Sequence, residues 1–338
     1  MGIFAGHPVL FLSKKAVKQR FESGVFVAGF RKCGTTSVYD FLAQTGMFRV
    51  ARYKEPQFFC LPDAIVDQHI HWYERLFEGG QQSPILDGST LYITDAEARP
   101  RIRQYVENPR FIICLRDPAK RFFSAYWHQR AKPGGIEQRS FDEILEGLQP
   151  AAGNALWQAE QKMLDQAALQ GRINLRDLSN QYHRRHYGAP FETEGMDTFA
   201  FFRYAGESMY SRFLSPWLDA ADTHIMIFEN LVEDPERELG RLSAFLQLPP
   251  DIPLSLPHNR NKNYNASGSA WLNRLARSGW YDRAKRLAPD VLKIWMREKW
   301  FASSEKMSVL QLKTVKEILT EEYLFWEQKH PELARPWS

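Results

Sequence analysis

Residues 25–37 read Val25-Phe26-Val27-Ala28-Gly29-Phe30-Arg31-Lys32-Cys33-Gly34-Thr35-Thr36-Ser37. The apolar run 25–30 predicts a short buried strand, and Val38, Phe41 and Leu42 follow the polar loop at helical spacing. Because this loop opens a helix, the free N–H groups and the dipole of the helix favour an anion there. The stretch therefore predicts a strand, an anion-binding loop and a helix, which together begin an α/β fold.

The loop nearly matches the nucleoside-triphosphate motif G-x-x-x-x-G-K-[ST]. It departs from that motif because Lys32 precedes the second glycine and Thr35 stands in the place of the lysine. This shift puts the ammonium on the outer side of the loop, against the outermost oxygen of an anion. No acidic strand end is positioned like the aspartate that holds magnesium in such proteins. The alternative interpretation is a glycine-threonine turn that only caps a helix.

Two further apolar runs continue the pattern. Residues 110–115 predict a second buried strand, followed by a turn and a helix over about 119–131, and residues 223–228 predict a third, followed by a helix over 235–246. Weaker strand candidates lie at residues 48–53 and 85–87. Strands that alternate with helices predict a mainly parallel central sheet flanked by helices.

The pattern changes between residues 134 and 206, where long polar helices such as 155–169 replace the alternation of strands and helices. A turn rich in arginine and histidine lies at 182–187. We interpret residues 134–206 as a helical insertion over one mouth of the sheet, within a single domain that spans residues 1–338.

Composition excludes several classes of protein. The 338 residues include 44 Lys+Arg and 40 Asp+Glu, and the net charge of +4 is too small and too well mixed for binding to nucleic acid by phosphate neutralisation alone. Three cysteines, Cys33, Cys60 and Cys114, form no C-x-x-C pair, which argues against a disulfide framework or a zinc site and favours a reducing compartment. No apolar run reaches the length of about 18 residues that a membrane span needs, and the run 9–12 is too short for a signal peptide. We expect a soluble, cytoplasmic protein with no nucleic-acid or membrane partner.

A second anion site is predicted after the second strand, where residues 116–126 read Arg116-Asp117-Pro118-Ala119-Lys120-Arg121-Phe122-Phe123-Ser124-Ala125-Tyr126. Arg116 leaves the carboxyl end of the strand, which is where open α/β sheets bind ligands. Arg121, Ser124 and His128 are three and four residues apart and share one helical face. A guanidinium and a hydroxyl suit a phosphate, whereas the alternative is an exposed Arg-Asp pair on an amphipathic helix.

Together these motifs resemble those of the sulfotransferases that use 3′-phosphoadenosine 5′-phosphosulfate (PAPS). The 5′-phosphosulfate loop of that family, G-x-x-K-x-G-T-T-[ST], follows its first strand as residues 29–37 do, and its 3′-phosphate motif, R-D-P-x-x-R-x-x-S-x-Y, matches residues 116–126 at every fixed position. Residues 54–59 (KEPQFF) are similar to the E-x-[QH]-F-F segment of the heparan sulfate sulfotransferases, and residues 126–130 (YWHQR) to the Y-x-H-Q-R of their glucosamine N-sulfotransferase domain. The resemblance covers about residues 25–264, is weak in the insertion, and implies a P-loop-kinase-like sulfotransferase fold.

The resemblance also implies how the donor is held. It assigns the 5′-phosphate to the hydroxyls of Thr35 and Thr36 and to the backbone of the loop, and the 3′-phosphate to Arg116 and Ser124. The 5′-phosphate loop as a whole comprises Arg31, Lys32, Cys33, Gly34, Thr35, Thr36 and Ser37. Lys32 is expected near the oxygen that bridges sulfate and phosphate, where negative charge grows as the bond breaks. No metal is required, because Lys32 and the helix N-terminus neutralise the departing phosphate.

Two residues are candidates for the general base. By its family position, Glu55 takes a proton from the acceptor hydroxyl or amine. The alternative for this carboxylate is a surface pair with Lys54 or Arg52. His128 is the second candidate, either as base or as a residue that orients the acceptor, because the ordinary pKa of histidine lies near neutral pH.

Two later segments carry weaker matches to the family. Lys262 and Tyr264 align with a K-G-[FY] loop that closes over the nucleotide, so Tyr264 is expected to stack on adenine, although the glycine and the cysteine pair that follows it in Golgi members are absent. Tyr210, in the segment GESMY, resembles the tyrosine of a G-x-Y segment, and a core tyrosine is the alternative.

One departure from the family bears on the chemistry. Some heparan sulfate sulfotransferases carry E-K-T-P-A-Y with a catalytic lysine, whereas this chain reads D-G-S-T-L-Y from Asp87, with Gly88 in the place of the lysine. Either Lys32 acts alone, or another cation such as Lys54 or Arg52 takes part.

The sequence thus predicts a sulfotransferase that moves the sulfuryl group of PAPS to a hydroxyl or amine of a small molecule, with a saccharide as the second acceptor class. The aromatic and basic residues around 182–204 are expected to help form the acceptor pocket. Two alternatives stay open: a P-loop nucleotide kinase or NTPase that uses ATP and magnesium, and a catalytically weak module that binds 3′-phosphoadenosine 5′-phosphate (PAP). The oligomeric state is left open.

Overall fold

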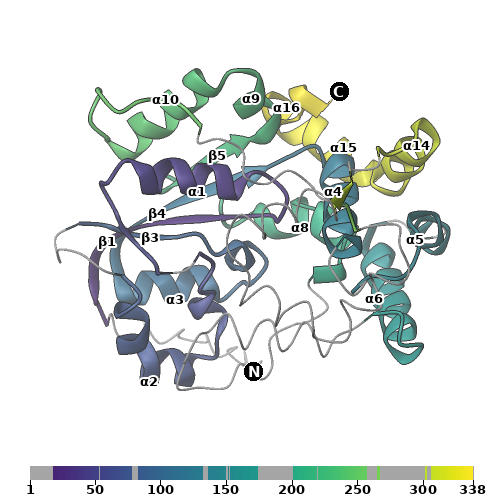
Figure 1. The fold of residues 1–338 in the computed structure, drawn as a ribbon, viewed down its shortest axis with the longest axis horizontal. Coiled ribbons are helices and arrows are strands. Elements are labelled where there is room, and N and C mark those ends of the chain that lie inside the picture. The colour runs from purple at the N-terminus through teal and green to yellow at the C-terminus, as the bar shows by residue number, and fades with distance from the viewer. Residues whose placement is uncertain are drawn as a thin grey trace, which may run out of the picture.

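A five-stranded sheet in which all pairings are parallel forms the centre of the fold, with the strand order β2-β3-β1-β4-β5 (Figure 1). The strands are β1 (Phe21–Gly29), β2 (Arg49–Val50), β3 (Ile85–Asp87), β4 (Val106–Leu115) and β5 (Thr223–Ile227). A separate antiparallel pair joins β6 (Asn265–Ala266) and β7 (Phe301–Ala302). The computed structural model describes residues 18–52, 54–77, 83–131, 136–149, 151, 153–173, 201–218, 220–256, 265–266, 301–302 and 306–337.

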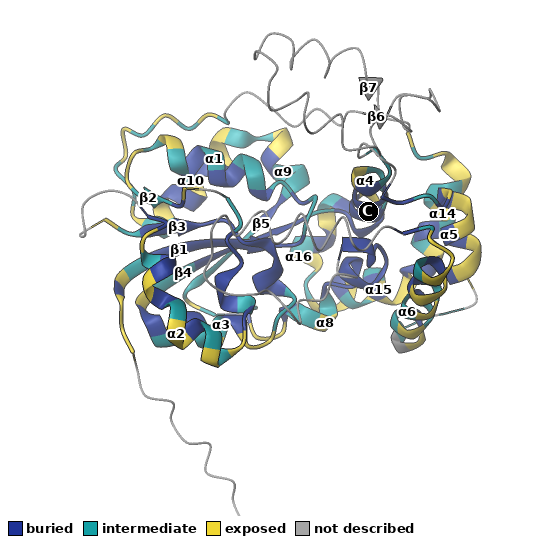
Figure 2. Ribbon diagram, turned by 60° about the horizontal axis from the view of Figure 1, so that its bottom comes forward, coloured by how far each residue is buried: buried dark blue, intermediate teal, exposed yellow. Residues whose placement is uncertain are grey.

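Helices cover both faces of the sheet. On one face lie α1 (Thr35–Gln44), α9 (Phe228–Glu233) and α10 (Pro235–Leu246), and on the other lie α2 (Asp63–Glu74) and α3 (Ala98–Tyr105) (Figures 1 and 2). This arrangement confirms the predicted α/β class with a parallel sheet flanked by helices, because parallel strands need both faces covered.

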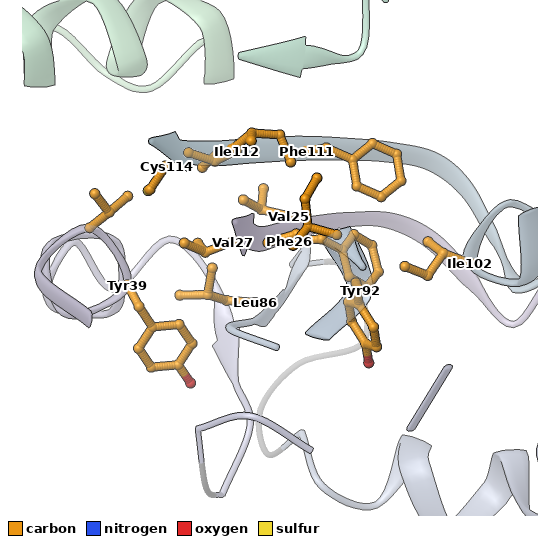
Figure 3. Close-up of a cluster of buried hydrophobic side chains, with 14 of the residues drawn as sticks. Val25, Phe26, Val27, Tyr39, Leu86, Tyr92, Ile102, Phe111, Ile112 and Cys114 are labelled. Atoms are coloured by element: carbon orange, nitrogen blue, oxygen red, sulfur yellow. The ribbon is translucent and has the colours of Figure 1, made fainter. Parts of the chain in front are cut away.

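The central strands are buried along most of their length, and they form the main hydrophobic core with the helices that cover them. Phe26 and Val27 of β1 and Ile112 of β4 have no exposed surface. Figure 3 shows these side chains in one cluster with neighbours from β3 and α1. Each such side chain contributes about 1.5–3 kcal/mol on leaving water, so the two central strands form a rigid support for the loops that follow them.

A second hydrophobic core lies beside the sheet. It joins α4 (Pro118–Arg130), α5 (Phe141–Leu148), α6 (Gly153–Leu169) and α14 (Val309–Ile318), whose buried faces point toward one another (Figure 2). The predicted helix 155–169 corresponds to α6, and the predicted helix 119–131 to α4. The Arg/His-rich turn at 182–187 lies outside the described residues.

The chain ends in helices that pack back onto the body of the protein. These are α15 (Thr320–Lys329) and α16 (Pro331–Ala334). Earlier in the chain, the short helix α8 (Ser211–Leu214) lies before β5. The hydroxyl of Tyr323 in α15 donates to Asp117 at 3.0 Å and accepts the N–H of Ala119 at 3.1 Å, so α15 fixes the start of α4. Among the described helices, none is long and apolar enough to cross a bilayer.

Strand boundaries differ from the sequence prediction at one end of the sheet. Both β1 and β4 begin four residues earlier than expected, at Phe21 and Val106. Their first halves carry polar residues, glycine and proline, and they pair as Ser23 with Asn108 and Gly24 with Pro109. These starts are partly exposed, so the apolar run that predicts a buried strand is missing there.

Candidate active site

The two predicted anion loops leave adjacent strands at the same edge of the sheet. Gly29, the last residue of β1, pairs with Cys114 near the end of β4. The strand order reverses here, because β3 lies on one side of β1 and β4 on the other, and open α/β sheets bind ligands at such a point. The loops touch: Nη1 of Arg116 donates to the carbonyl oxygen of Lys32 at 3.2 Å.

The backbone of the first loop is unusual at two residues. Lys32 and Gly34 have φ angles of 73° and 88°, both in the left-handed region. Helix α1 begins directly afterwards at Thr35. The first N–H that bonds to the start of the helix is that of Ser37, which donates to the carbonyl oxygen of Gly34 at 2.9 Å and leaves the N–H groups of Thr35 and Thr36 before it. A side chain at Gly34 is excluded by space as well, because a Cβ there would lie 2.6 Å from the ring of Phe228. The left-handed backbone costs about 1–3 kcal/mol of strain at a non-glycine residue such as Lys32.

The charge of Lys32 is poorly compensated in the free protein. Burial lowers the pKa of Lys32 to about 8, and the nearby guanidiniums of Arg116 and Arg121 add to this effect. The carboxylate of Glu55 acts in the opposite direction, which places Glu55 close enough to influence Lys32. An anion bound at the loop would supply the missing negative charge.

Arg116 has one N–H group available to bind a ligand. Its guanidinium lies over the ring of Phe228 at 4.8 Å, and its Nε is buried with no hydrogen-bond partner in the described part of the chain. A buried donor without an acceptor is costly, and a phosphate oxygen is the kind of acceptor that a guanidinium binds best. This observation fits the predicted role of Arg116 toward a phosphate.

Tyr210 lies beneath both loops. It is fully buried, its hydroxyl donates to the carbonyl oxygen of Arg116 at 2.9 Å, and its ring packs on Phe30 at 4.4 Å. The same hydroxyl is 3.6 Å from Sγ of Cys33, whose pKa is raised to about 11 by burial. Tyr210 thus supports the two loops from the core, which is the alternative that the sequence left open.

Arg31 and Arg121 connect the first loop to residues 201–208. Both guanidiniums form ion pairs with Glu207, and that of Arg31 also lies over the ring of Phe201 at 4.3 Å. Arg121 is fully buried and donates to the carbonyl oxygens of Arg31 at 3.2 Å and Tyr204 at 2.9 Å. These arginines hold the loop in place, and the side chain of Arg31 is directed to Glu207.

Two hydroxyls predicted to bind the sulfuryl donor are buried, whereas the second candidate for the base is exposed. Thr35 at the start of α1 and Ser124 in α4 are both buried. His128 lies one turn beyond Ser124 on α4 and is exposed. The charge of Glu55 acts on Lys32, where it raises the pKa of the ammonium.

Glu55 is held in a strained and well-connected turn. Its φ is 66°, and its carboxylate accepts hydrogen bonds from Nζ of Lys54 at 2.7 Å and from the hydroxyl of Thr90 at 3.2 Å. The pair with Lys54 is the alternative considered from the sequence, but both side chains are about four-fifths buried, so it is not an exposed surface pair.

A buried network fixes that turn to the sheet. The carboxylate of Asp87, at the end of β3, accepts the hydroxyls of Tyr73 and Tyr92 at 2.7 and 2.9 Å and the N–H of Ser89 at 2.9 Å. The hydroxyl of Ser89 accepts the N–H of Gln57 at 2.8 Å. Asp87 is thereby linked through two hydrogen bonds to the turn that carries Glu55.

Sequence reasoning missed the contribution of the segment after β5. Phe228 packs against both Gly34 and Arg116, and the carboxylate of the next residue, Glu229, accepts the N–H of Asp117 at 3.2 Å. Burial raises the pKa of Glu229. A usable signal existed, because the third predicted strand ends at the same edge of a parallel sheet as the first two.

Two predicted donor-site residues, Lys262 and Tyr264, lie outside the described residues. Within the described ranges, no group of three or more His, Cys, Asp or Glu side chains is arranged to hold a metal ion.

The chain belongs to the sulfotransferase family, because the model of the sulfotransferase domain matches residues 22–266, which include both loops and Glu55. Among solved structures, the chain is similar to a sulfotransferase from Alicyclobacillus acidocaldarius (21% identity, 72% of this chain and 87% of that chain, TM-score 0.46). It is also similar to the sulfotransferase domain of the curacin biosynthetic pathway (14% identity, 90% and 98%, TM-score 0.41) and to mouse sulfotransferase SULT7A1 complexed with PAP (11% identity, 94% and 89%, TM-score 0.42). No curated protein sequence matches the chain significantly.

Proposed function

We propose that the protein transfers the sulfuryl group of PAPS to a hydroxyl or amine of a small-molecule acceptor, with a saccharide as the second acceptor class. The observation that carries the proposal is the contact between the two anion loops. There Lys32, whose pKa is lowered, follows β1, and Arg116, whose Nε has no hydrogen-bond partner among the described residues, follows β4. Two separate sets of donors suit a ligand with two phosphate groups better than a ligand with one chain of phosphates.

The donor set fits PAPS. The N–H groups at the start of α1 and the hydroxyls of Thr35 and Thr36 would hold the 5′-phosphate, and Arg116 and Ser124 the 3′-phosphate. When bound, PAPS supplies the sulfuryl group and a phosphate leaving group. The protein contributes fixed positive charge and N–H dipoles at the place where negative charge develops.

Two residues take part in the reaction itself, one as general base and one by stabilising the negative charge on the leaving group. Glu55 accepts the proton of the acceptor O–H or N–H as the acceptor atom forms its bond to sulfur. The bond between sulfur and the phosphate oxygen breaks, the electron pair stays on that oxygen, and the ammonium of Lys32 stabilises it. The products are the sulfated acceptor, PAP and a proton on Glu55, so atoms and charges balance.

The finer assignments rest on sequence similarity. The segments 54–59 and 126–130 support the heparan sulfate type within the family, and the basic and aromatic segment 182–204 supports an acceptor pocket built by the insertion. We place the protein in the cytoplasm because its cysteine usage suits a reducing compartment.

Ligand-induced stabilisation tests the donor. A ligand bound only by the native state raises stability as RT ln(1+[L]/Kd), so PAP at about 100 times its Kd should add about 2.7 kcal/mol and raise the Tm. ATP should raise it less, because it lacks a 3′-phosphate. An unchanged Tm at millimolar PAP, or a larger shift with ATP and magnesium, would refute the proposal and favour a nucleotide kinase. Transfer of ³⁵S from labelled PAPS to 2-naphthol, tyramine or glucosamine then identifies the acceptor class and distinguishes an enzyme from a binding module.

A further inference from the structure

The side chain of Lys54 packs against Gly88, at a position where a larger residue than glycine would not fit. A Cβ added at Gly88 would lie 3.2 Å from Cε of Lys54 and 2.7 Å from Cδ2 of Tyr39. The φ of Gly88 is outside the left-handed region, so the backbone does not require glycine there. The lack of space requires glycine at position 88, because Gly88 and the ring of Tyr39 form a slot through which the methylene chain of Lys54 passes.

The slot holds the ammonium of Lys54 at the site. Nζ of Lys54 donates to Glu55 at 2.7 Å and to the carbonyl oxygen of Gly88 at 3.4 Å, and it lies 5.8 Å from the centre of the Tyr39 ring. The side chain is 19% exposed. Figure 3 shows Tyr39 extending from α1 beside Leu86 of β3, with its hydroxyl pointing away from β1 and β4. That hydroxyl is buried without a hydrogen-bond partner among the described residues, so Tyr39 contributes mainly its ring to the slot.

We propose that Lys54 is the positioning residue of Glu55, and that Gly88 and Tyr39 hold Lys54 for this task. The proposal rests on the proposed function, in which Glu55 takes the proton of the acceptor. It also identifies the cation that lies beside Gly88, where some family members carry a lysine: the ammonium is that of Lys54, the residue before Glu55.

The geometry explains what Lys54 does for the reaction. Glu55 lies in the left-handed region, which is unfavourable for a residue with a side chain. Lys54 holds one carboxylate oxygen, while Thr90 at 3.2 Å and Gln57 at 3.4 Å hold the other. The hydrogen bond from the ammonium fixes the orientation of the carboxylate that accepts the proton. During transfer the proton moves from the acceptor to Glu55, and Lys54 neither gains nor loses one.

A double-mutant cycle tests the proposal. Lys54→Met should lower kcat for transfer of ³⁵S from PAPS to the best acceptor among 2-naphthol, tyramine and glucosamine by up to about 10²-fold, as expected when a reacting group is misplaced. PAP affinity should stay within about twofold of wild type, because the phosphates are held elsewhere. In a Glu55→Gln background, Lys54→Met should have no further effect, since no base remains to be positioned. Lys54→Arg should restore part of kcat.

Two further variants strengthen the test. Gly88→Ala should close the slot and lower kcat in the same way, again only when Glu55 is present. Lys313→Met removes an ammonium from an exposed position on α14 and serves as the control that keeps full activity.

The outcomes separate this proposal from the proposed function. Wild-type kcat in Lys54→Met, or an equal loss with and without Glu55, overturns the positioning role. A parallel loss of PAP affinity and Tm in Lys54→Met also overturns it, because it indicates a structural role only. A wild-type protein that binds PAP but transfers no label to any acceptor refutes the proposed function itself, and this inference falls with it.

Discussion

PAP binding should weaken at alkaline pH because of one residue, Lys32. Its pKa is lowered to about 8, mainly by burial and next by the charge of Arg116. Lys32 is therefore charged below about pH 8 and neutral above it. Phosphate groups are already almost fully ionised at about pH 7, so only the lysine changes charge over the alkaline range. The protonated fraction of Lys32 falls about tenfold between about pH 7 and pH 9, and the affinity for PAP should fall by the same factor, about 1.4 kcal/mol.

Calorimetric titration of PAP at about pH 7, 8 and 9, in two buffers that differ in ionisation enthalpy, measures both the affinity and the protons bound. A bound phosphate raises the pKa of Lys32, so binding should take up a proton over the range in which the free lysine is neutral. Lys32→Met removes the titrating group and should make the affinity weak and independent of pH. Cys33 does not interfere, because burial raises the pKa of its thiol to about 11.

Three results would refute this reasoning. One is an affinity for PAP that is constant from about pH 7 to pH 9 in the wild type. Another is an alkaline decrease that persists in Lys32→Met, because a different group would then titrate. The third is proton release on binding instead of uptake, which would mean that the ligand site is not the environment of Lys32.

Four further predictions follow from the same site. Arg116→Ala should reduce the preference for PAP over adenosine 5′-phosphosulfate by about 1.5–3 kcal/mol, measured as the ratio of their Kd values; an unchanged ratio contradicts the 3′-phosphate role. Glu55→Gln should lower turnover by about 10²–10⁴-fold with PAP affinity intact, whereas a large loss only in His128→Ala would move the base to His128. Gly34→Ala should lower the free energy of unfolding in urea more than Gly46→Ala does, because both glycines have positive φ but, among the described residues, only Gly34 has a close neighbour, Phe228; equal losses would show that contact to be unimportant. Lys32→Met should stabilise the ligand-free protein at neutral pH. The pKa of Lys32 in the folded state, about 8, lies below the ordinary value of 10.5, so the charged lysine destabilises the folded protein fully below about pH 8 and not at all above about pH 10.5. Unfolding in urea at both ends of that range measures whether the stability changes in this direction.

The parts of the site that the sequence predicted are those in which chemistry and geometry are local. Residues 29–37 and 116–126 each combine the end of a strand, a loop and the start of a helix in one contiguous run. A parallel sheet then brings the two loops to the same edge without further information. The early starts of β1 and β4 escaped prediction because those residues are partly exposed and contain glycine, proline and polar residues.

The roles of individual side chains depended on contacts that are distant in the sequence. Nothing local to Arg31 shows that its guanidinium pairs with Glu207, 176 residues away. Likewise, the segment GESMY does not reveal that Tyr210 lies under the carbonyl of Arg116. The slot for Lys54 is a property of three segments together, since Gly88 follows β3 and Tyr39 belongs to α1. Such packing follows from the assembled core and has no signature in the spacing of residues.

The strained residues of this chain connect its stability to its chemistry. Of the four non-glycine residues with positive φ in the described ranges, three are Lys32, Glu55 and Gln57, in the two turns that carry the proposed cation and base. Strain of about 1–3 kcal/mol at each such residue persists only where surrounding contacts determine the backbone, as Arg116 does at Lys32 and Ser89 at Gln57. The same edge of the sheet also holds a lysine with a lowered pKa and a buried guanidinium nitrogen that has no hydrogen-bond partner among the described residues. The uncompensated charge and the unmet donor make the ligand-free protein less stable, and a bound anion would relieve both, because it supplies negative charge and a hydrogen-bond acceptor. These observations support the proposal that the rigid core beneath β1 and β4 preorganises the site for an anionic ligand.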